Sequence, residues 1–219
     1  TDGHFNKVIA GARAYGSEHD NVNVEIQSPT SATSYDEQVN MIETALGNPG
    51  IDAVVIAPQQ STSTATLVDT ATKPVVALDT DFTSDKKACF DTMPDKAAAA
   101  MEAVIQKYPN GVDAVLSIAD DMALAAAKVI KDSGNTNYAD TVLCGFDGNQ
   151  SAIEAVMDGS LTIDIAQMGY DMGYKAVEAA VTVLEGGSVE SFIDSGSKVI
   201  DSSNIDEYVS DMKSKGLWE

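Results

Sequence analysis

Hydrophobic residues along the chain follow two patterns that alternate from one end to the other. Apolar residues spaced three or four positions apart predict helices, whereas short continuous apolar runs predict buried strands. Helices are expected over residues 5–19, 34–47, 94–108, 121–133, 149–158 and 169–186, with a short one before KPVVALD and one at the C-terminus. Strands are expected at VNVEIQ, IDAVVIAP, KPVVALD, VDAVLSIAD, TVLCGFD and LTIDIAQ, followed by a weak strand near 192–200.

The predicted strands are apolar at consecutive rather than alternate positions. This pattern is typical of parallel sheets that helices cover on both faces, so we predict an α/β fold. Ligands of such sheets bind beyond the carboxyl ends of the strands. The loops expected there are APQQS, LDTDF, IADDM, GFDGN and AQMGY.

Charge and composition exclude several classes of partner. The 34 Asp and Glu residues against 13 Lys and Arg give a net charge of −21, which repels phosphate backbones and anionic lipid surfaces. We therefore expect no nucleic acid partner. No apolar run approaches the roughly 18 residues that a membrane span requires, so we expect no direct membrane insertion.

The two cysteines and two histidines do not form a metal-binding pattern. Cys89 and Cys144 lack C-x-x-C spacing, and His4 and His19 lie far from both in the sequence. We therefore expect no metal and no cofactor. A disulfide between the cysteines is compatible with the sequence, which does not assign it.

Four segments, taken together, resemble the type I periplasmic sugar-binding proteins, which are ribose-binding-like receptors of ABC transporters with repressor relatives. The segments are QSPTSATSYDEQVNMIE, IDAVVIAP with PVVALDTD, DDMALAAAKVI with CGFDGNQSAIEAVMDGSLTIDIAQ, and MGYKAVEAAVTVLEG. The resemblance implies two doubly wound parallel-sheet lobes joined by a hinge. One lobe would hold residues 1–90 and 168–197, and the other would hold residues 91–167 and 198–219.

The same resemblance implies a receptor that performs no chemistry and binds a small neutral sugar in an interlobe cleft. Its partners would be the sugar and an ABC permease. The protein would be a monomer, periplasmic or extracellular, and either free or lipid-anchored. Carried over position by position, the ligand contacts fall on Asp2, His4, Phe5, Asp79, Asp147 and Gln167.

These residue types suit a neutral sugar. Carboxylates accept hydrogen bonds from hydroxyl groups strongly, and an aromatic ring can cover an apolar sugar face. Phe5 would stack on the sugar, Asp79 and Asp147 would accept hydroxyl hydrogens, and Gln167 would donate and accept. Asp120 and Asp121, at the start of a predicted helix, are expected to be helix N-caps rather than ligands.

The chain departs from the family pattern in two ways. Ala119 stands where an Asn is common, which removes an amide from the expected cleft. The family also has a strand before Thr1 and a crossover segment, with an arginine that clamps the sugar, between Phe90 and Asp91. Because a parallel sheet without an interior strand would expose apolar faces, we expect these segments to be omitted from this sequence rather than lost from the protein.

Two alternatives remain open. VVALDTDFT matches the strand-end signature of haloacid dehalogenase-type Mg-dependent phosphatases, with Asp79 as nucleophile and Asp81 as acid. The motif stands far from the N-terminus and lacks a Lys at an obvious strand end, which argues against this hypothesis. The effector-binding domain of a lactose-repressor-type regulator would share the fold and the cleft.

Overall fold

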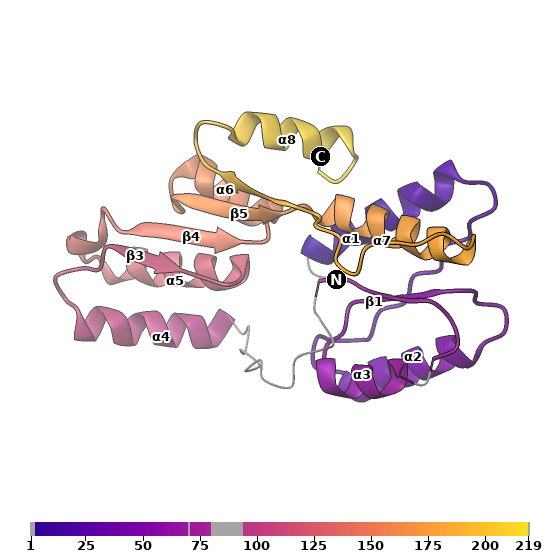
Figure 1. The fold of residues 1–219 in the computed structure, drawn as a ribbon. Helices are drawn as coiled ribbons and strands as arrows, with labels where there is room; N and C mark the ends of the chain where they lie inside the picture. Colours follow the sequence, from indigo (N-terminus) through magenta and orange to yellow (C-terminus); the bar gives the residue numbers. More distant parts are fainter. Residues whose placement is uncertain (1–2, 70, 80–93, 219) are drawn as a thin grey trace. The chain divides into compact units, whose positions relative to one another are not determined.

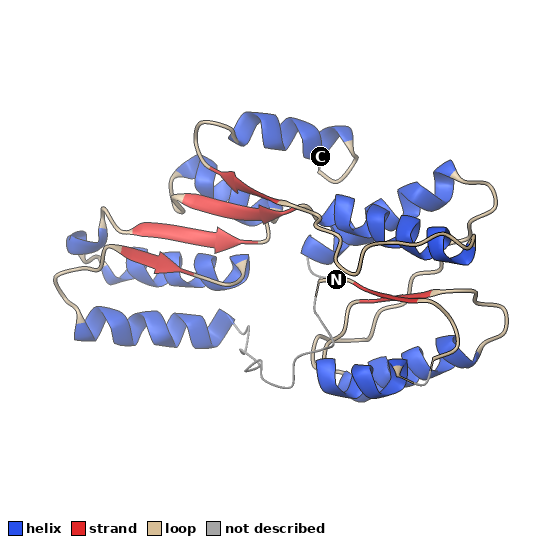
Figure 2. Ribbon diagram, in the orientation of Figure 1, coloured by secondary structure: helices blue, strands red, loops and turns tan. Residues whose placement is uncertain are grey.

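The chain alternates helices and strands in a computed structural model that describes residues 3–69, 71–79 and 94–218 (Figures 1 and 2). It divides into two compact units. Unit 1 comprises residues 1–88 and 169–195, and unit 2 comprises residues 89–168 and 196–219. The α/β architecture predicted from the hydrophobic pattern is confirmed.

Unit 1 is a small parallel sheet between two pairs of helices. Its strands β1 and β2 pair in parallel, with Val55 opposite Val76. Figure 1 shows α1 and α7 on one face of this sheet and α2 and α3 on the other. The elements are α1 (Gly3–Glu18), α2 (Tyr35–Gly47), β1 (Val54–Ile56), α3 (Ser61–Val68), β2 (Val75–Ala77) and α7 (Gly169–Leu184).

Helices α1 and α7 approach each other closely because glycines line their contact. A Cβ atom at Gly11 would overlap the carbonyl oxygen of Tyr170, and one at Gly173 would overlap that of Val8. The backbones therefore meet where any side chain would hold them apart. This contact joins two segments of unit 1 that are far apart in the sequence.

Unit 2 is built on a four-stranded sheet of order β3-β4-β5-β6. The first three strands are parallel, whereas β6 is antiparallel to β5, with Val199 opposite Ile165. The buried residues Ile153, Leu161 and Ile200 lie at the centre of its main core. The elements are α4 (Pro94–Lys107), β3 (Ala114–Leu116), α5 (Asp120–Ser133), the 3-10 helix η1 (Thr136–Tyr138), β4 (Val142–Phe146), α6 (Gln150–Asp158), β5 (Ile163–Gln167), β6 (Ser197–Ile200) and α8 (Ile205–Ser214).

The predicted strand VNVEIQ is not formed, and that prediction was wrong. Val22, Val24 and Ile26 do pack against the unit 1 core of Ala12, Tyr15 and Val177. Their segment makes no strand ladder with any described residue. The alternating apolar positions therefore reflect packing on helices rather than membership of a sheet.

One face of the unit 2 sheet is less covered than the continuous apolar runs predict. Leu116 on β3 is 75% exposed, and Val142 on β4 and Val199 on β6 are also exposed. The strand registers place these side chains on the same face. The expectation of helices over both faces therefore fails for this face of unit 2.

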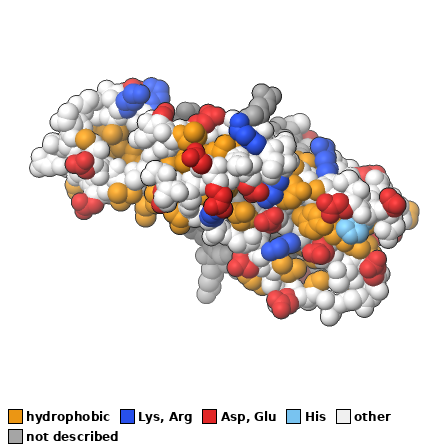
Figure 3. Space-filling model, turned by 90° about the horizontal axis from the view of Figure 1, so that it is seen from above, with side chains coloured by type: hydrophobic (Ala, Val, Ile, Leu, Met, Phe, Trp, Pro, Cys, Tyr) orange, Lys and Arg blue, Asp and Glu red, His pale blue; other side chains and the backbone are white. Residues whose placement is uncertain are grey.

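The surface carries acidic side chains in many places. Figure 3 shows Asp and Glu scattered over the visible face, with Lys and Arg side chains between them. Within the described residues, no helix is long and apolar enough to cross a membrane.

Candidate functional site

The predicted site residues form two groups, one in each unit, and each group includes a carboxylate that follows a strand. In unit 1, His4 lies at the start of α1 and Asp79 follows β2. The His4 Nε2 atom is 3.1 Å from Asp79 Oδ1. The His4 side chain is only 3% exposed, whereas that of Asp79 is 23% exposed. His4 therefore orients the Asp79 carboxylate, and little of the His4 side chain itself is exposed to solvent.

Phe5 is the aromatic member of the unit 1 group. Its ring meets the His4 ring edge to face, with centroids 5.2 Å apart and planes at 71°. Phe5 is partly buried, so part of its ring stays accessible. Asp2, the remaining predicted contact in this unit, lies outside the described residues.

In unit 2 the structure brings Asp147 and Gln167 together. The Gln167 side-chain amide donates a hydrogen bond to Asp147 Oδ1 over 2.7 Å. Asp147 follows β4 and Gln167 ends β5, so adjacent parallel strands deliver both side chains to the same edge. Both residues are partly buried, which leaves polar atoms within reach of a ligand.

Asp79 and Asp147 both have positive backbone φ angles, which are unusual for residues other than glycine. Their φ angles are 65° and 127°, and they are the non-glycine residues with positive φ among those described. Such angles cost of the order of 1–3 kcal/mol each and cluster at functional sites. The angle at Asp147 is the more strained, because it lies outside the left-handed helical region that Asp tolerates.

The loop that carries Asp147 is anchored by a contact with helix α8. The Tyr208 hydroxyl on α8 donates a hydrogen bond to the Gly148 carbonyl oxygen over 3.2 Å. Gly148 has a φ of 70°, and a Cβ atom there would crowd both Tyr208 and Ala166. This close packing around Gly148 stabilises the strained backbone of the preceding Asp147.

Asp120 is a residue of this loop region that the sequence prediction missed. It was expected to cap its own helix, but the N-cap of α5 is Ala119. Asp120 is fully buried, and its Oδ2 atom accepts the backbone N–H of Asn149 over 2.7 Å. Burial and a hydrogen bond with Asp164 raise the pKa of Asp120 to about 9. An Asp inside the otherwise apolar run LTIDIAQ was the available sequence signal for this pair.

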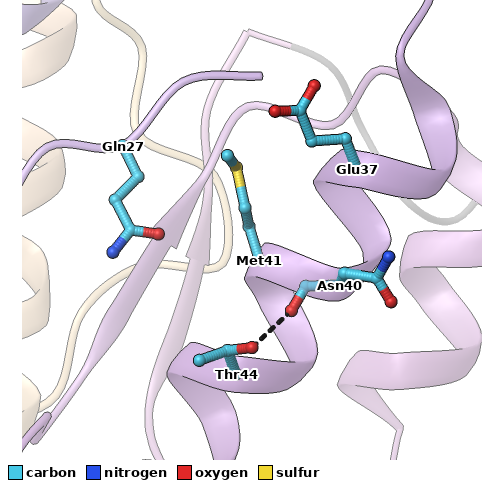
Figure 4. A pocket seen from close by; sticks show the side chains of 5 residues that line it. All are labelled: Gln27, Glu37, Asn40, Met41 and Thr44. Atoms are coloured by element: carbon cyan, nitrogen blue, oxygen red, sulfur yellow. Dashed lines mark hydrogen bonds between the residues drawn. The ribbon is translucent and has the colours of Figure 1, made fainter. Parts of the chain in front are cut away.

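A separate hollow in unit 1 lies beside α2 (Figure 4). Its volume is about 510 Å³, and its lining residues are Gln27, Glu37, Asn40, Met41 and Thr44. The Glu37 carboxylate already accepts two hydrogen bonds, from the backbone N–H and from the hydroxyl of Thr30. None of the described predicted site residues lines this hollow.

The described residues hold no group of three or more His, Cys, Asp and Glu side chains that could bind a metal ion. Cys144 is buried and free, and burial raises the pKa of its thiol. Asp81, which the phosphatase hypothesis requires, and Cys89 both lie outside the described residues. The described polar side chains at the strand ends are hydrogen-bond acceptors and donors.

Comparison with known proteins gives a family match over part of the chain. Residues 85–188 match a family model described as a periplasmic binding protein domain. The ribose import binding protein of Bacillus subtilis (strain 168) is 36% identical over 98 residues, which make up 45% of this chain and 30% of that protein. The aligned region thus spans about a third of the length of this curated relative.

Solved structures match over nearly the whole chain. A periplasmic solute-binding protein of an ABC transporter from Actinobacillus succinogenes, with bound D-allose, has a TM-score of 0.80 at 15% identity, covering 95% of this chain and 96% of that one. One from Agrobacterium vitis with bound α-D-tagatopyranose has a TM-score of 0.82 at 17% identity, covering 96% and 94%. The chain has the fold of these proteins.

These matches confirm the resemblance predicted from the four sequence segments. They support the hypothesis of a sugar-binding receptor, and they support neither the phosphatase nor the repressor alternative.

Proposed function

We propose, from the resemblance of this chain to the sugar-binding proteins of ABC transporters, that it is a solute receptor for a small neutral sugar. In this proposal it performs no chemistry, works outside the cytoplasmic membrane and delivers its ligand to an ABC permease. The permease would recognise the ligand-bound form, because binding shifts the receptor toward the conformation that contacts the sugar best.

The observation that carries the proposal is the Asp147–Gln167 pair on its strained loop. The 2.7 Å hydrogen bond from Gln167 uses one acceptor position of the Asp147 carboxylate and orients the Asp147 side chain. The remaining lone pairs of Asp147 are suited to accept hydroxyl hydrogens, since an ionised carboxylate has about four acceptor positions. A neutral ligand fits this arrangement, because an anion would be repelled by the carboxylate and by the net charge of −21.

The unit 1 group offers the complementary chemistry. Phe5 presents part of an aromatic ring, which can cover the apolar C–H face of a sugar ring. Asp79 presents a partly exposed carboxylate that His4 contacts through its Nε2 atom. In the proposal, this group contributes stacking and a hydrogen-bond acceptor.

The proposal is tested by isothermal titration of the whole chain with pentoses, hexoses and cyclic polyols. We expect saturable heat with at least one neutral sugar. Asp147→Ala should weaken its binding by about 10- to 150-fold for each hydrogen bond lost, because hydrogen bonds to a charged group contribute about 1.5–3 kcal/mol each. Phe5→Ala should weaken the same binding without abolishing it.

Asp132→Ala provides the matched control. Asp132 is an exposed carboxylate of unit 2 that pairs with Lys128, away from the strand ends. Its replacement should leave the affinity unchanged. Absence of heat with every compound of the panel contradicts the proposal, as would Mg-dependent phosphatase activity that Asp79→Asn removes.

A further inference from the structure

A pair of buried carboxyl groups lies directly beneath the Asp147 loop. Asp120, at the start of α5, and Asp164, within β5, both have 0% exposure. Gly145 stands opposite Asp164 in the β4–β5 register. A Cβ atom at Gly145 would collide with Asp164 Oδ2 and with Asp120 Oδ1, so both oxygen atoms lie over this glycine.

Two ionised carboxylates in such a place would repel each other. Ionised carboxylates are acceptors only, so the two groups can hydrogen-bond to each other only when one of them carries a proton. Two carboxyl groups that share a buried site hold one proton to unusually high pH for this reason.

Of the groups packed around the pair, Asp147 strengthens this preference, because its charge also raises the pKa of Asp120. Asp147 after β4, Cys144 in β4 and Tyr208 on α8 all act electrostatically with Asp120 or Asp164, and Asp211 on α8 acts on Tyr208. All of these are acids. Burial, the hydrogen bond between the two carboxyl groups and the Asp164 charge raise the pKa of Asp120 to about 9, and burial together with the same two carboxyl groups raises the pKa of the Tyr208 hydroxyl.

We propose that Asp120 and Asp164 share one proton at neutral pH, and that this protonated pair positions the Asp147–Asn149 loop. Asp120 connects the pair to the loop, because its other oxygen accepts the Asn149 N–H over 2.7 Å. Asp120 is thus a positioning residue that acts through the loop backbone. Tyr208, hydrogen-bonded to Gly148, holds the same loop from α8.

The sign of the pH effect follows from the raised pKa. In the unfolded chain an Asp loses its proton near pH 4, whereas the folded pair keeps one proton up to about pH 9. Between these values the folded state binds more protons, so stability falls as pH rises. The effect on sugar affinity rests on the proposed function, because it requires Asp147 to be a ligand contact.

The proton itself is tested without any sugar. Trp218 is the only tryptophan, and its ring lies edge to face against Tyr208 with centroids 5.6 Å apart, so its fluorescence reports on unit 2. Urea unfolding of the whole chain is followed at pH 5.5 to 8, in the presence of a chelator. We expect the folding equilibrium constant to fall by up to about tenfold per pH unit through this one proton.

Asp164→Asn separates a shared proton from a merely structural role. An Asn side chain can donate to Asp120 at every pH, so the variant should lose most of this pH slope. Asp121→Asn, at an exposed neighbouring position of α5, should keep the wild-type slope. Equal slopes for the wild type and Asp164→Asn overturn the proposal, as does a slope that millimolar Ca²⁺ or Mg²⁺ removes from the wild type.

Infrared spectroscopy of the wild type keeps the test valid if Asp164→Asn does not fold. A protonated carboxyl band should persist at pH 7.5, and its absence overturns the proposal. Where a sugar has been found to bind, its affinity should fall from pH 7 to pH 9 in the wild type and stay nearly constant in Asp164→Asn. A protein that binds no sugar but keeps the carboxyl band refutes the proposed function alone.

Discussion

At the scale of the residue, the site includes two Asp residues whose backbone φ angles are unfavourable for an Asp side chain. Asp79 and Asp147 hold positive φ angles that an L-residue adopts at a cost, and each lies just after a parallel strand. The surrounding packing stabilises these conformations. A carboxylate is thereby fixed at each strand end at the expense of stability.

We predict that Asp147→Gly stabilises the protein while it weakens sugar binding. Glycine adopts a φ of 127° freely, so relief of strain should raise the free energy of unfolding by about 1 kcal/mol. The urea midpoint measures this gain. Asp140→Gly is the control: Asp140 is exposed and is not among the residues with positive φ, so this change should instead lower stability by about 0.5–1 kcal/mol. A loss of stability in both variants would contradict the strain argument.

At the scale of the element, the hydrophobic pattern predicted nearly every helix and strand, because 3.6-residue and continuous apolar patterns are local properties. The failures have a common cause. VNVEIQ has the composition of a strand, but a strand forms only when another strand pairs with it. Val22, Val24 and Ile26 instead pack against residues of α1 and α7. Asp120 has the position of a cap, but its side chain turns to Asn149 on another element.

The contact between α1 and α7 leads to a prediction for unit 1. Gly173→Ala should lower the free energy of unfolding by about 1–3 kcal/mol, because its Cβ would overlap the Val8 carbonyl and push the helices apart. Chemical denaturation followed by circular dichroism measures the change.

Gly47→Ala is the matched control for this helix contact. Gly47 ends α2, and no atom lies within 4 Å of the position that its Cβ would take. Without a neighbour to displace, the alanine should raise stability by up to about 0.5–1 kcal/mol. If Gly173→Ala proved as harmless as Gly47→Ala, the helices would not be packed through their glycines.

At the scale of the whole molecule, the net charge of −21 decides how the protein responds to salt. Self-repulsion of this size destabilises a compact chain, and salt screens it over about 10 Å at 0.1 M. We therefore predict that Tm rises by several degrees between about 10 and 300 mM NaCl in differential scanning calorimetry. Choline chloride at the same ionic strength should give a similar rise. A rise with Na⁺ alone would indicate specific cation binding instead of screening.

The sequence by itself determined the α/β class, the order of the elements and the two strand-end carboxylates, because these follow from local patterns and from motifs that stand together in the chain. Asp79, Asp147 and Gln167 were named through the resemblance to the sugar-binding proteins, and their role as sugar contacts remains a prediction. His4 was named too, but its burial and its contact with Asp79 came only from the fold.

Only the tertiary structure decided which side chains face each other. Asp120 and Asp164 are 44 positions apart, and they meet because α5 begins beside β4 while β5 pairs with that strand. The antiparallel β6 and the exposed Leu116 likewise depend on neighbours that no local pattern encodes. Long-range contacts set the burial of a side chain, and burial determines whether a carboxyl group keeps its proton.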